Sequence, residues 1–382
     1  MFGKAITLFK VFGFAVRMDA SWLVIAVLVA WSLAAGLFPE IHPGLSPAAY
    51  WTMGLVGALG LFASIVVHEL CHSLVARRFG LPIKGITLFI FGGVAEMADE
   101  PPSPKAEFFI AVGGPAASVV IAGVCYGVHA LALLAGWPTA VTGVLGWLGL
   151  INLVLVAFNM IPGYPMDGGR VLRSALWHWK KNIRWATKIA SKVGVAFGMV
   201  LIGLGVVSFI FGNIIGGLWW FLIGMFIRSA AMRSYEQLVV RQTLGHETVG
   251  HIMNDNPVAV APDTSVQQLV DDYMLRYHYK TFPVVDHGDL VGCVSVPEVK
   301  QLPREQWSQH QVAEIIQPCS NENTVGADDE ATEAMDKFAK GQTSRLMVVR
   351  EGHLVGILAL RDLMKFLAMK NELEGDGPAK AA

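Results

Sequence analysis

Long apolar stretches separated by short polar segments fill the chain up to about residue 235, whereas charged residues are spread evenly after about residue 243. An apolar helix needs about 20 residues to cross the hydrocarbon core of a bilayer. Six stretches are accordingly predicted to be membrane spans: Asp19–Phe38, Trp51–Val75, Glu107–Ala135, Thr139–Ile161, Val193–Phe211 and Ile214–Arg228. The pattern therefore predicts a polytopic α-helical membrane domain over residues 1–235 and a soluble part after it.

The distribution of Lys and Arg predicts how these spans are oriented. Basic residues occur before the first span, after the second, before the third, after the fourth and after the sixth, and the segments 39–50, 136–138 and 212–213 contain none. By the positive-inside rule both termini are then cytoplasmic, as in a multi-pass protein of the cell (inner) membrane. A cleaved signal peptide is the alternative for the first apolar stretch, but its length favours a retained span.

The second predicted span contains His68-Glu69-Leu70-Cys71-His72, an HExxH motif. Residues four apart on a helix share one face and lie about 6 Å apart along its axis, so both imidazoles can reach one metal ion. Glu69 lies beside them, where it can act as a general base. Two histidines inside a core helix are the alternative, but ionisable side chains in a membrane segment usually mark a functional site.

A catalytic zinc ion typically has three protein ligands and one open position. The segment Asn159–Arg170, after the fourth span, contains two prolines and three glycines that break the helix, and it includes Asp167. The predicted topology places Asp167 on the same side of the membrane as the HExxH motif, so we expect it to be the third ligand of one Zn²⁺ ion. Glu96 and Asp99 are the next candidates. The two glycines after Asp167 would also suit a simple tight turn.

The segment Gly80–Asp99 is apolar, rich in β-branched residues and interrupted by glycines, and it is too short for a spanning helix. We predict a β-hairpin here. Two placements remain open for it: a re-entrant hairpin at membrane depth, with an edge strand near the metal site, and a plain cytoplasmic hairpin.

Composition narrows the classes of function. The chain is 54% hydrophobic and 15% charged, which is more apolar than an ordinary soluble protein. Its net charge of −1 gives no indication of a nucleic-acid partner. The four cysteines form no CxxC motif, so we expect free thiols and no disulfide framework.

The soluble part contains an internal duplication. The segments Val249–Met253, Phe282–Val285 and Leu290–Gly292 recur as Val312–Ile316, Leu346–Val349 and Leu354–Gly356. Each copy is predicted to have an extended segment, a helix (Val266–Tyr277; Ala331–Ala339), two strands and a closing helix, and to pack against its twin. The predicted boundaries are a linker at 236–246, repeats at 247–303 and 304–370, and a disordered tail at 371–382.

The HExxH of the second span, the proline-framed Asn159 and Met166-Asp167-Gly168-Gly169, and the paired repeat together resemble the site-2 protease family. These are intramembrane zinc metalloproteases, and the similar subgroup has six spans and a C-terminal pair of CBS domains. The resemblance implies a six-span membrane domain with a re-entrant β-hairpin, followed by a soluble α/β tandem CBS domain pair. It implies the zinc ligands His68, His72 and Asp167, with Glu69 as general base.

The resemblance also implies contacts to a substrate. Asn159 matches the asparagine of the family motif and is expected to make a polar contact to the substrate or the catalytic centre. Gly92 and Gly93 match the segment that pairs with an unwound substrate, and strand addition to an edge would present an extended chain for cleavage. The expected partners are membrane lipid and membrane-embedded or membrane-associated regulatory proteins, such as tethered transcription regulators, which would be cut within or near a transmembrane segment.

The sequence departs from the family pattern in two places. Ser118 follows Gly114-Pro115-Ala116-Ala117 where family members often have Asn, and its function stays open. CBS pairs typically bind adenosine compounds through an Asp that follows a Ser or Thr. The first repeat has Ser295 but Glu298 in place of the Asp, and the second has Asp362 but Ala359 in place of the Ser or Thr. An adenine nucleotide contacting Ser295 and Asp362 is one interpretation, and a structural role with homodimerisation through the CBS pair is the other.

Two hypotheses compete with that of a protease regulated through a cytoplasmic CBS pair. A CBS-regulated membrane ion transporter or channel could line an ion path with buried His and Asp. A proteolytically inactive scaffold would retain only the fold. Glu69 argues against the transporter or channel, because a transport site needs no general base between two metal ligands. The intact HExxH motif argues against the scaffold.

Overall fold

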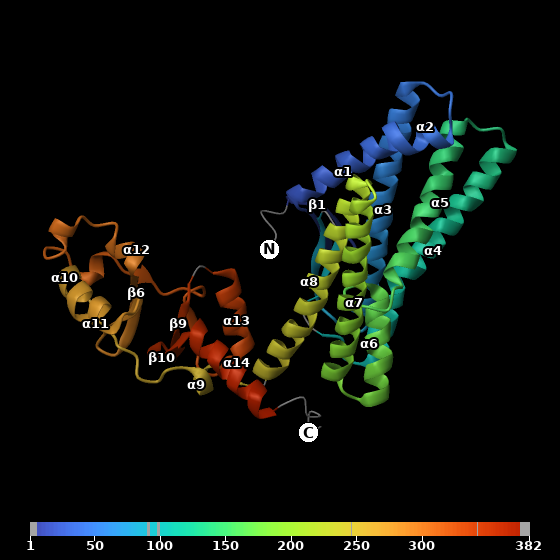
Figure 1. Cartoon of the computed structure of the whole chain (residues 1–382). Helices are drawn as coiled ribbons and strands as arrows, with labels where there is room; N and C mark the ends of the chain where they lie inside the picture. Colours follow the sequence, from blue (N-terminus) through green and yellow to red (C-terminus); the bar gives the residue numbers. More distant parts are fainter. Residues whose placement is uncertain (1–5, 90–91, 98–99, 246, 342, 375–382) are drawn as a thin grey trace. The chain divides into compact units, whose positions relative to one another are not determined.

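The computed structural model describes residues 6–89, 92–97, 100–245, 247–341 and 343–374 (Figure 1). The chain divides into two compact units, Met1–Glu236 and Gln237–Ala382.

Six helices in the described part of the chain are long and apolar enough to cross a membrane, as predicted. The first span combines α1 (Ala20–Ser32), a π-helical turn (Leu33–Leu37) and α2 (Phe38–Ile41). The others are α3 (Pro47–Arg78), α4 (Pro104–Leu134), α5 (Thr139–Asn159), α7 (Ile183–Ile210) and α8 (Ile214–Leu244). α7 begins before the predicted Val193 and α8 continues past the predicted Arg228, because a helix can extend beyond the apolar stretch that crosses the bilayer.

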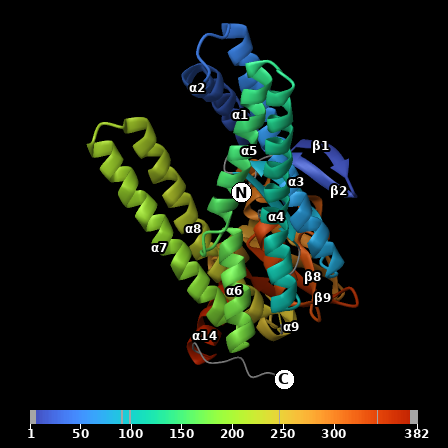
Figure 2. The ribbon, with the colours of Figure 1, turned by 90° about the vertical axis from the view of Figure 1, so that its right-hand side faces the viewer.

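The spans turn large apolar side chains outward. Leu59, Val120 and Leu131 are each more than half exposed, a surface that water disfavours and lipid solvates. Where α7 and α8 meet, the contacting residues are small. A Cβ placed on Gly198 of α7 would lie 2.8 Å from the carbonyl oxygen of Gly224 on α8, so the two backbones touch, as is common in membrane helix pairs. Figures 1 and 2 show α7 and α8 side by side.

A four-stranded sheet belongs to the first unit, in the order β1 (Ile6–Val11), β2 (Phe14–Met18), β3 (Ile83–Phe89) and β4 (Gly92–Met97). β1–β2 and β3–β4 are antiparallel hairpins, and β2 pairs with β3 in parallel. The hairpin predicted within Gly80–Asp99 is therefore present, and its depth in the membrane stays a prediction. The first hairpin is not predicted above. Its signal is the Phe12-Gly13 turn, whose φ angles of 49° and 87° are those of a tight two-residue hairpin turn.

A further helix, α6 (Asp167–Lys180), follows the irregular segment 160–166. No helix is predicted here from the sequence, so α6 is an addition to the expected elements. Its buried face carries Gly169, Arg173 and Ser174 rather than large apolar residues. The apolar residues between Val171 and Trp179 nevertheless recur with the helical period, so the sequence did carry a signal for this helix.

The second unit contains two copies of one α/β arrangement. Its sheet has the order β5-β6-β10-β9-β8, with β7 paired to β6. The strands are β5 (Thr281–Asp286), β6 (Asp289–Ser295), β7 (Gln317–Pro318), β8 (Thr324–Gly326), β9 (Arg345–Arg350) and β10 (His353–Ala359). The helices are α9 (Val249–Ile252), the continuous α10 (Val266–Gln268), π turn (Leu269–Met274) and α11 (Leu275–Tyr277), then α12 (Val296–Val299), α13 (Ala331–Lys340) and α14 (Leu360–Glu374).

The two repeats exchange their first segments. Val249, which opens the first repeat, is buried in the core of the second repeat together with Leu244 at the end of α8. Val312, which opens the second repeat, is buried in the core of the first. Each copy therefore needs its twin to complete its core, which is the physical reason why the repeat occurs as a pair.

Two predicted boundaries shift in the structure. The linker expected at 236–246 is helical up to Leu244, because α8 continues through it. The first residues of the tail expected at 371–382 are helical, because α14 continues to Glu374. Residues 375–382 lie outside the described residues.

Candidate metal centre

α3 carries His68 and His72 on one buried face. The helix begins after Ser46, whose hydroxyl accepts a hydrogen bond from the amide of Ala49, and Pro47 occupies its first turn. Both features are favoured at helix N-termini. The two histidines are only 5% and 4% exposed, and the centroids of their rings lie 4.8 Å apart. The helical period alone therefore brings the two imidazoles together.

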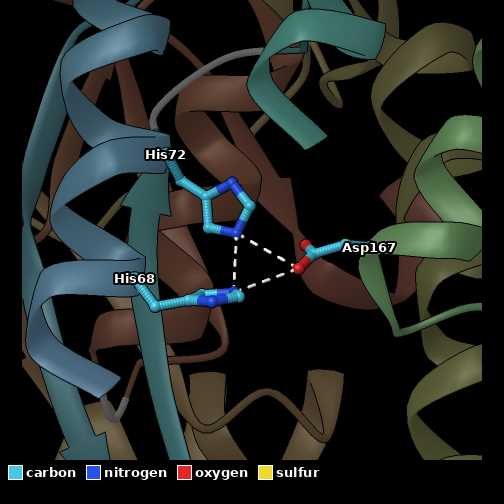
Figure 3. Close-up of side chains that lie close together, drawn as sticks. All are labelled: His68, His72 and Asp167. Carbon is cyan, nitrogen blue, oxygen red and sulfur yellow. Dashed lines mark hydrogen bonds and ion pairs between the residues drawn. The ribbon is translucent and has the colours of Figure 1, made fainter. Parts of the chain in front are cut away.

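Asp167 reaches the histidines from the first turn of α6, on the opposite side of the group from α3 (Figure 3). Gly168 and Gly169 fix its place. A Cβ on Gly168 would lie 2.3 Å from the carbonyl oxygen of Met160, and one on Gly169 would lie 2.3 Å from the carbonyl carbon of Gly163. Only glycine permits so close a packing of the irregular segment against the start of α6. The glycine pair thus does more than form a turn.

The three side chains converge on one point. Asp167 Oδ2 lies 3.1 Å from His68 Nε2 and 3.2 Å from His72 Nε2, and the two Nε2 atoms are 3.1 Å apart (Figure 3). A tetrahedral zinc ion with bonds of about 2.0–2.1 Å holds its ligand atoms about 3.3 Å apart. The spacing therefore fits one zinc ion with little movement. Two histidines and a carboxylate also leave a fourth position open, as catalytic zinc sites do.

The charge on Asp167 is stabilised locally. Burial by itself would raise the pKa of this carboxyl group, but the hydrogen bonds to His68 and His72 outweigh burial and hold the pKa below its ordinary value. The position at a helix N-terminus also favours a negative charge. Asp167 is thus an anion suited to a divalent cation.

The outer nitrogen of each imidazole is also engaged. His68 Nδ1 lies 2.9 Å from Ser118 Oγ, and His72 Nδ1 lies 2.6 Å from the carbonyl oxygen of Ile110. Both partners belong to α4. An imidazole whose Nδ1–H is hydrogen-bonded presents the lone pair of Nε2 to a metal, so the contacts with α4 match the convergence of the two Nε2 atoms.

The polar partners on α4 and α6 have no assigned role in the sequence analysis, where the function of Ser118 stays open. Ser118 is completely buried, and so is Glu107, which forms an ion pair with Arg173 of α6. Arg173 Nε lies 2.5 Å from Glu107 Oε1. The sequence signal for Glu107 was available, because an ionisable residue within a span seldom lacks a partner. A single serine in an apolar helix gives no such signal.

The other predicted site residues fall at different places. Gly93 lies directly against Glu69, because a Cβ placed on Gly93 would be 2.8 Å from Glu69 Cγ. Gly92 is the first residue of β4 and pairs with Phe89. Asn159 is the partly buried last residue of α5. Of the alternative ligands, the side chain of Glu96 and all of Asp99 lie outside the described part of the structure.

In the second unit, Asp362 lines a cavity of about 560 Å³ together with Tyr279, Arg345 and Arg361. Ser295 is not among the described residues that line this cavity. It precedes α12, where its amide donates a hydrogen bond of 2.8 Å to Glu298 and its hydroxyl contacts the same carboxylate. The structure therefore does not bring Ser295 and Asp362 to one cavity.

Comparisons with known proteins agree with this architecture. The sequence model of peptidase family M50 matches residues 56–143 and 132–201, and that of the CBS domain matches residues 249–302 and 312–369. Rip3 of Mycobacterium tuberculosis is 34% identical over 367 residues, which cover 95% of this chain and 93% of Rip3. Zinc metalloprotease MJ0392 of Methanocaldococcus jannaschii is 30% identical over 376 residues, which cover 97% of this chain and 99% of that protein.

One solved structure is also similar. The site-2 protease from Methanocaldococcus jannaschii is 32% identical, with a TM-score of 0.42, over 60% of this chain and 94% of that chain.

Proposed function

This chain belongs to peptidase family M50, the site-2 protease family of zinc metalloproteases, and carries a CBS domain pair; we propose that it is an intramembrane endopeptidase. It would cleave membrane-embedded or membrane-associated regulatory proteins within or near a transmembrane segment. The convergence of His68, His72 and Asp167 in a buried group carries this proposal. The family is one of peptidases, which argues against the alternative of a CBS-regulated transporter or channel.

The residues of the centre would have different roles in peptide hydrolysis. His68, His72 and Asp167 would hold the zinc ion. Zinc, when bound, polarises a carbonyl group and lowers the pKa of water. Glu69 would take a proton from the attacking water and deliver it to the leaving amine, as a general base and then a general acid. The low exposure of the centre strengthens each of these electrostatic contributions, because bulk water is kept away.

The edge strand β4 would receive the substrate. β4 ends the order of the described sheet in the first unit, so its outer edge can accept an extended chain by strand addition. Gly93 of β4 packs against Glu69, which brings this edge to the general base. A transmembrane helix hides its carbonyl groups, so we propose that the substrate unwinds to pair near Gly92 and Gly93. Asn159 would contribute a polar contact to the substrate or the centre.

The CBS pair would regulate cleavage. In the cavity at Asp362, the guanidinium carbon of Arg345 lies 4.4 Å from the centre of the Tyr279 ring, and a flat aromatic surface beside cationic groups suits an adenine nucleotide. Asp362 would bind the ribose hydroxyls, with Arg361 nearby for a phosphate. The last residue of α8, Leu244, is buried in the core of the second repeat. A change in the repeats can therefore act on the helix that forms the sixth span.

The proposed setting is the cell (inner) membrane, with both termini in the cytoplasm and lipid around the six spans. The distribution of basic residues supports this orientation. We also propose that two copies of the chain can associate through their CBS pairs. No nucleic-acid partner is proposed.

Cleavage by the purified protein tests the proposed function. Single-span proteins that are shortened on co-expression with the wild type would be reconstituted with the enzyme in lipid, and cleavage would be followed by mass spectrometry. Glu69→Gln should keep the fold and the zinc but lose cleavage by about 10²–10⁴-fold or more, because the amide cannot accept the proton.

Asp167→Ala is the matched comparison. It should lose zinc as well as activity, since two ligands hold zinc poorly. Wild-type cleavage by Glu69→Gln would contradict the role of the general base, and full zinc occupancy in Asp167→Ala would point to another third ligand.

A further inference from the structure

One face of α4 contacts both histidines of the metal centre and, through Arg173, the helix that carries Asp167. Glu107, Ile110, Gly114 and Ser118 are spaced three, four and four residues apart, which places them on a single helical face. Each of them lies against a ligand or against the helix that carries one. The face extends over about three turns of the helix.

Ser118 acts on His68. Its hydroxyl is 2.9 Å from His68 Nδ1, and both groups are shielded from solvent, with exposures of 0% for Ser118 and 5% for His68. With the Nδ1–H of His68 donating to Ser118 Oγ, the ring is held in one orientation and the Nε2 lone pair points at the shared centre. Without the hydroxyl, a buried N–H group would have no acceptor, which disfavours this arrangement.

Ile110 and Gly114 act on the neighbouring histidine and on the space between the rings. The carbonyl oxygen of Ile110 takes the corresponding contact with His72 Nδ1 at 2.6 Å. Gly114 leaves the volume that both rings use, because a Cβ there would lie 2.2 Å from His72 Nε2 and 2.4 Å from His68 Nε2. His72 is thus oriented by the backbone, whereas His68 depends on a side chain.

Glu107 acts on Asp167 through α6. Arg173 lies on α6, which begins with Asp167, and it is 4% exposed. It pairs with the fully buried Glu107, with a second ion pair of 3.2 Å to Glu100 and the Tyr164 ring centre 5.2 Å from its guanidinium carbon. A buried charge pair has a narrow range of favourable geometries. This pair therefore fixes α6 against α4 and, with it, the position of the Asp167 carboxylate.

We propose that this face of α4 orients all three ligands, and that Ser118 and Glu107 are positioning residues for the metal centre. The inference rests on the proposed function only in that the three ligands must bind zinc. It assigns a role to Ser118, which the motif leaves open, and to the pair of Glu107 and Arg173. The third span, α4, then holds α3 and α6 in the relative position that brings the three ligands together.

Zinc affinity of the purified protein tests the role of Ser118. Ser118→Ala should weaken zinc binding by about 10–100-fold in competition with a chelator, because partners of the outer nitrogen have effects of this size. The visible spectrum of the cobalt-substituted protein should change as well, since it reports ligand geometry. Ser118→Thr keeps a hydroxyl and should restore much of the affinity.

Ser191→Ala provides a matched control. Ser191 is also a buried serine in a spanning helix, and its hydroxyl has no hydrogen-bond partner in the described part of the chain. It should leave zinc affinity and the cobalt spectrum unchanged. Wild-type affinity and spectrum in Ser118→Ala would overturn the role of Ser118. Failure of the wild-type protein itself to bind zinc would instead contradict the proposed function.

A double variant that is expected to fold tests the role of Glu107 and Arg173. Glu107→Leu combined with Arg173→Met replaces the buried pair with apolar side chains, an exchange that is often neutral or stabilising for the fold. We expect the double variant to unfold at or above the wild-type temperature but to bind zinc at least 10-fold more weakly. A folded double variant with wild-type zinc affinity would show that the pair only stabilises the fold. It would overturn the proposal that Glu107 is a positioning residue for the metal centre.

Discussion

The metal centre and the cavity at Asp362 are built in opposite ways. At the metal centre, three atoms lie within 3.2 Å of one another on residues that are no more than 9% exposed. The cavity of the second unit has a volume of about 560 Å³ and a lining in which charged, aromatic and apolar side chains mix. The first arrangement determines the position of one ion, whereas the second offers many separate contacts to a larger molecule. Single substitutions should therefore abolish zinc binding at the metal centre but only weaken the proposed nucleotide binding in the cavity.

The two repeats of the second unit also differ at the position of the acidic residue, Glu298 in the first and Asp362 in the second. In the first repeat, the Glu298 carboxylate is already used by the protein, since it accepts hydrogen bonds from the amide of Ser295 at 2.8 Å and from the side chain of Gln317 at 2.7 Å. The corresponding Asp362 of the second repeat lines the cavity. The carboxylate of Glu298 is therefore engaged by the protein itself, whereas Asp362 lies at the cavity that we propose for a nucleotide.

The largest effect is expected from one methyl group at the metal centre. Gly114→Ala places a Cβ 2.2 Å from His72 Nε2 and 2.4 Å from His68 Nε2, so the rings must move apart and zinc binding should be lost. Gly113→Ala is the matched control, because the nearest atom to its Cβ is the side chain of Val75 at 3.3 Å. Metal analysis of the two purified variants should show no zinc in the first and nearly full occupancy in the second. Equal zinc occupancy in the two variants would show that the metal centre tolerates an added methyl group, which would contradict the expected contrast with the cavity.

A graded effect is expected in the cavity. Asp362→Ala should weaken binding of an adenine nucleotide by about 10–100-fold, the range for one hydrogen bond to a charged group, and should leave zinc content unchanged. Ser295→Ala should bind as the wild type does, because Ser295 does not line the cavity. Calorimetric titration of ATP, ADP and AMP into the full chain measures this. If none of them binds at millimolar concentration, the nucleotide proposal is wrong and the pair is better regarded as a dimerisation module.

The smallest effect concerns stability at the start of the second unit. Lys370 Nζ lies 2.5 Å from Glu247 Oε1, and hydrogen bonds first from Lys370 and then from His251 lower the pKa of Glu247. Because the folded pKa is below the unfolded one, this stabilisation is present above the unfolded pKa and is lost as the pH falls through the folded pKa. Glu247→Gln should lower the free energy of unfolding by less than about 1 kcal/mol at pH 7.

The pH dependence gives the control for that measurement. The difference between Glu247→Gln and the wild type should shrink as the pH falls below about 4, where an ordinary glutamate is protonated. Thermal unfolding of the purified full chain at several pH values measures it. Glu372→Gln, at an exposed position of α14, should show no such difference. An effect of Glu247→Gln that is independent of pH would mean that packing, and not charge, is responsible.

The sequence by itself determined the elements that depend on local periodicity. Apolar length predicted the six spans, the four-residue spacing of His68 and His72 predicted their shared face, and the duplicated segments predicted the paired repeat. Asp167 was reached less directly, through the orientation of the spans. These inferences succeed because a helix or a repeat imposes its period on neighbouring residues, whatever lies around it.

Only the tertiary structure decided which distant groups meet. It placed Ser118 against His68 and Glu107 against Arg173, and it opened the space at Gly114. It also placed Asp362, but not Ser295, among the described residues that line the cavity of the second unit. A buried serine or glycine has no pattern along the chain, because its role is set by a partner tens of residues away. The free energy of such a contact exists only when both helices are packed together.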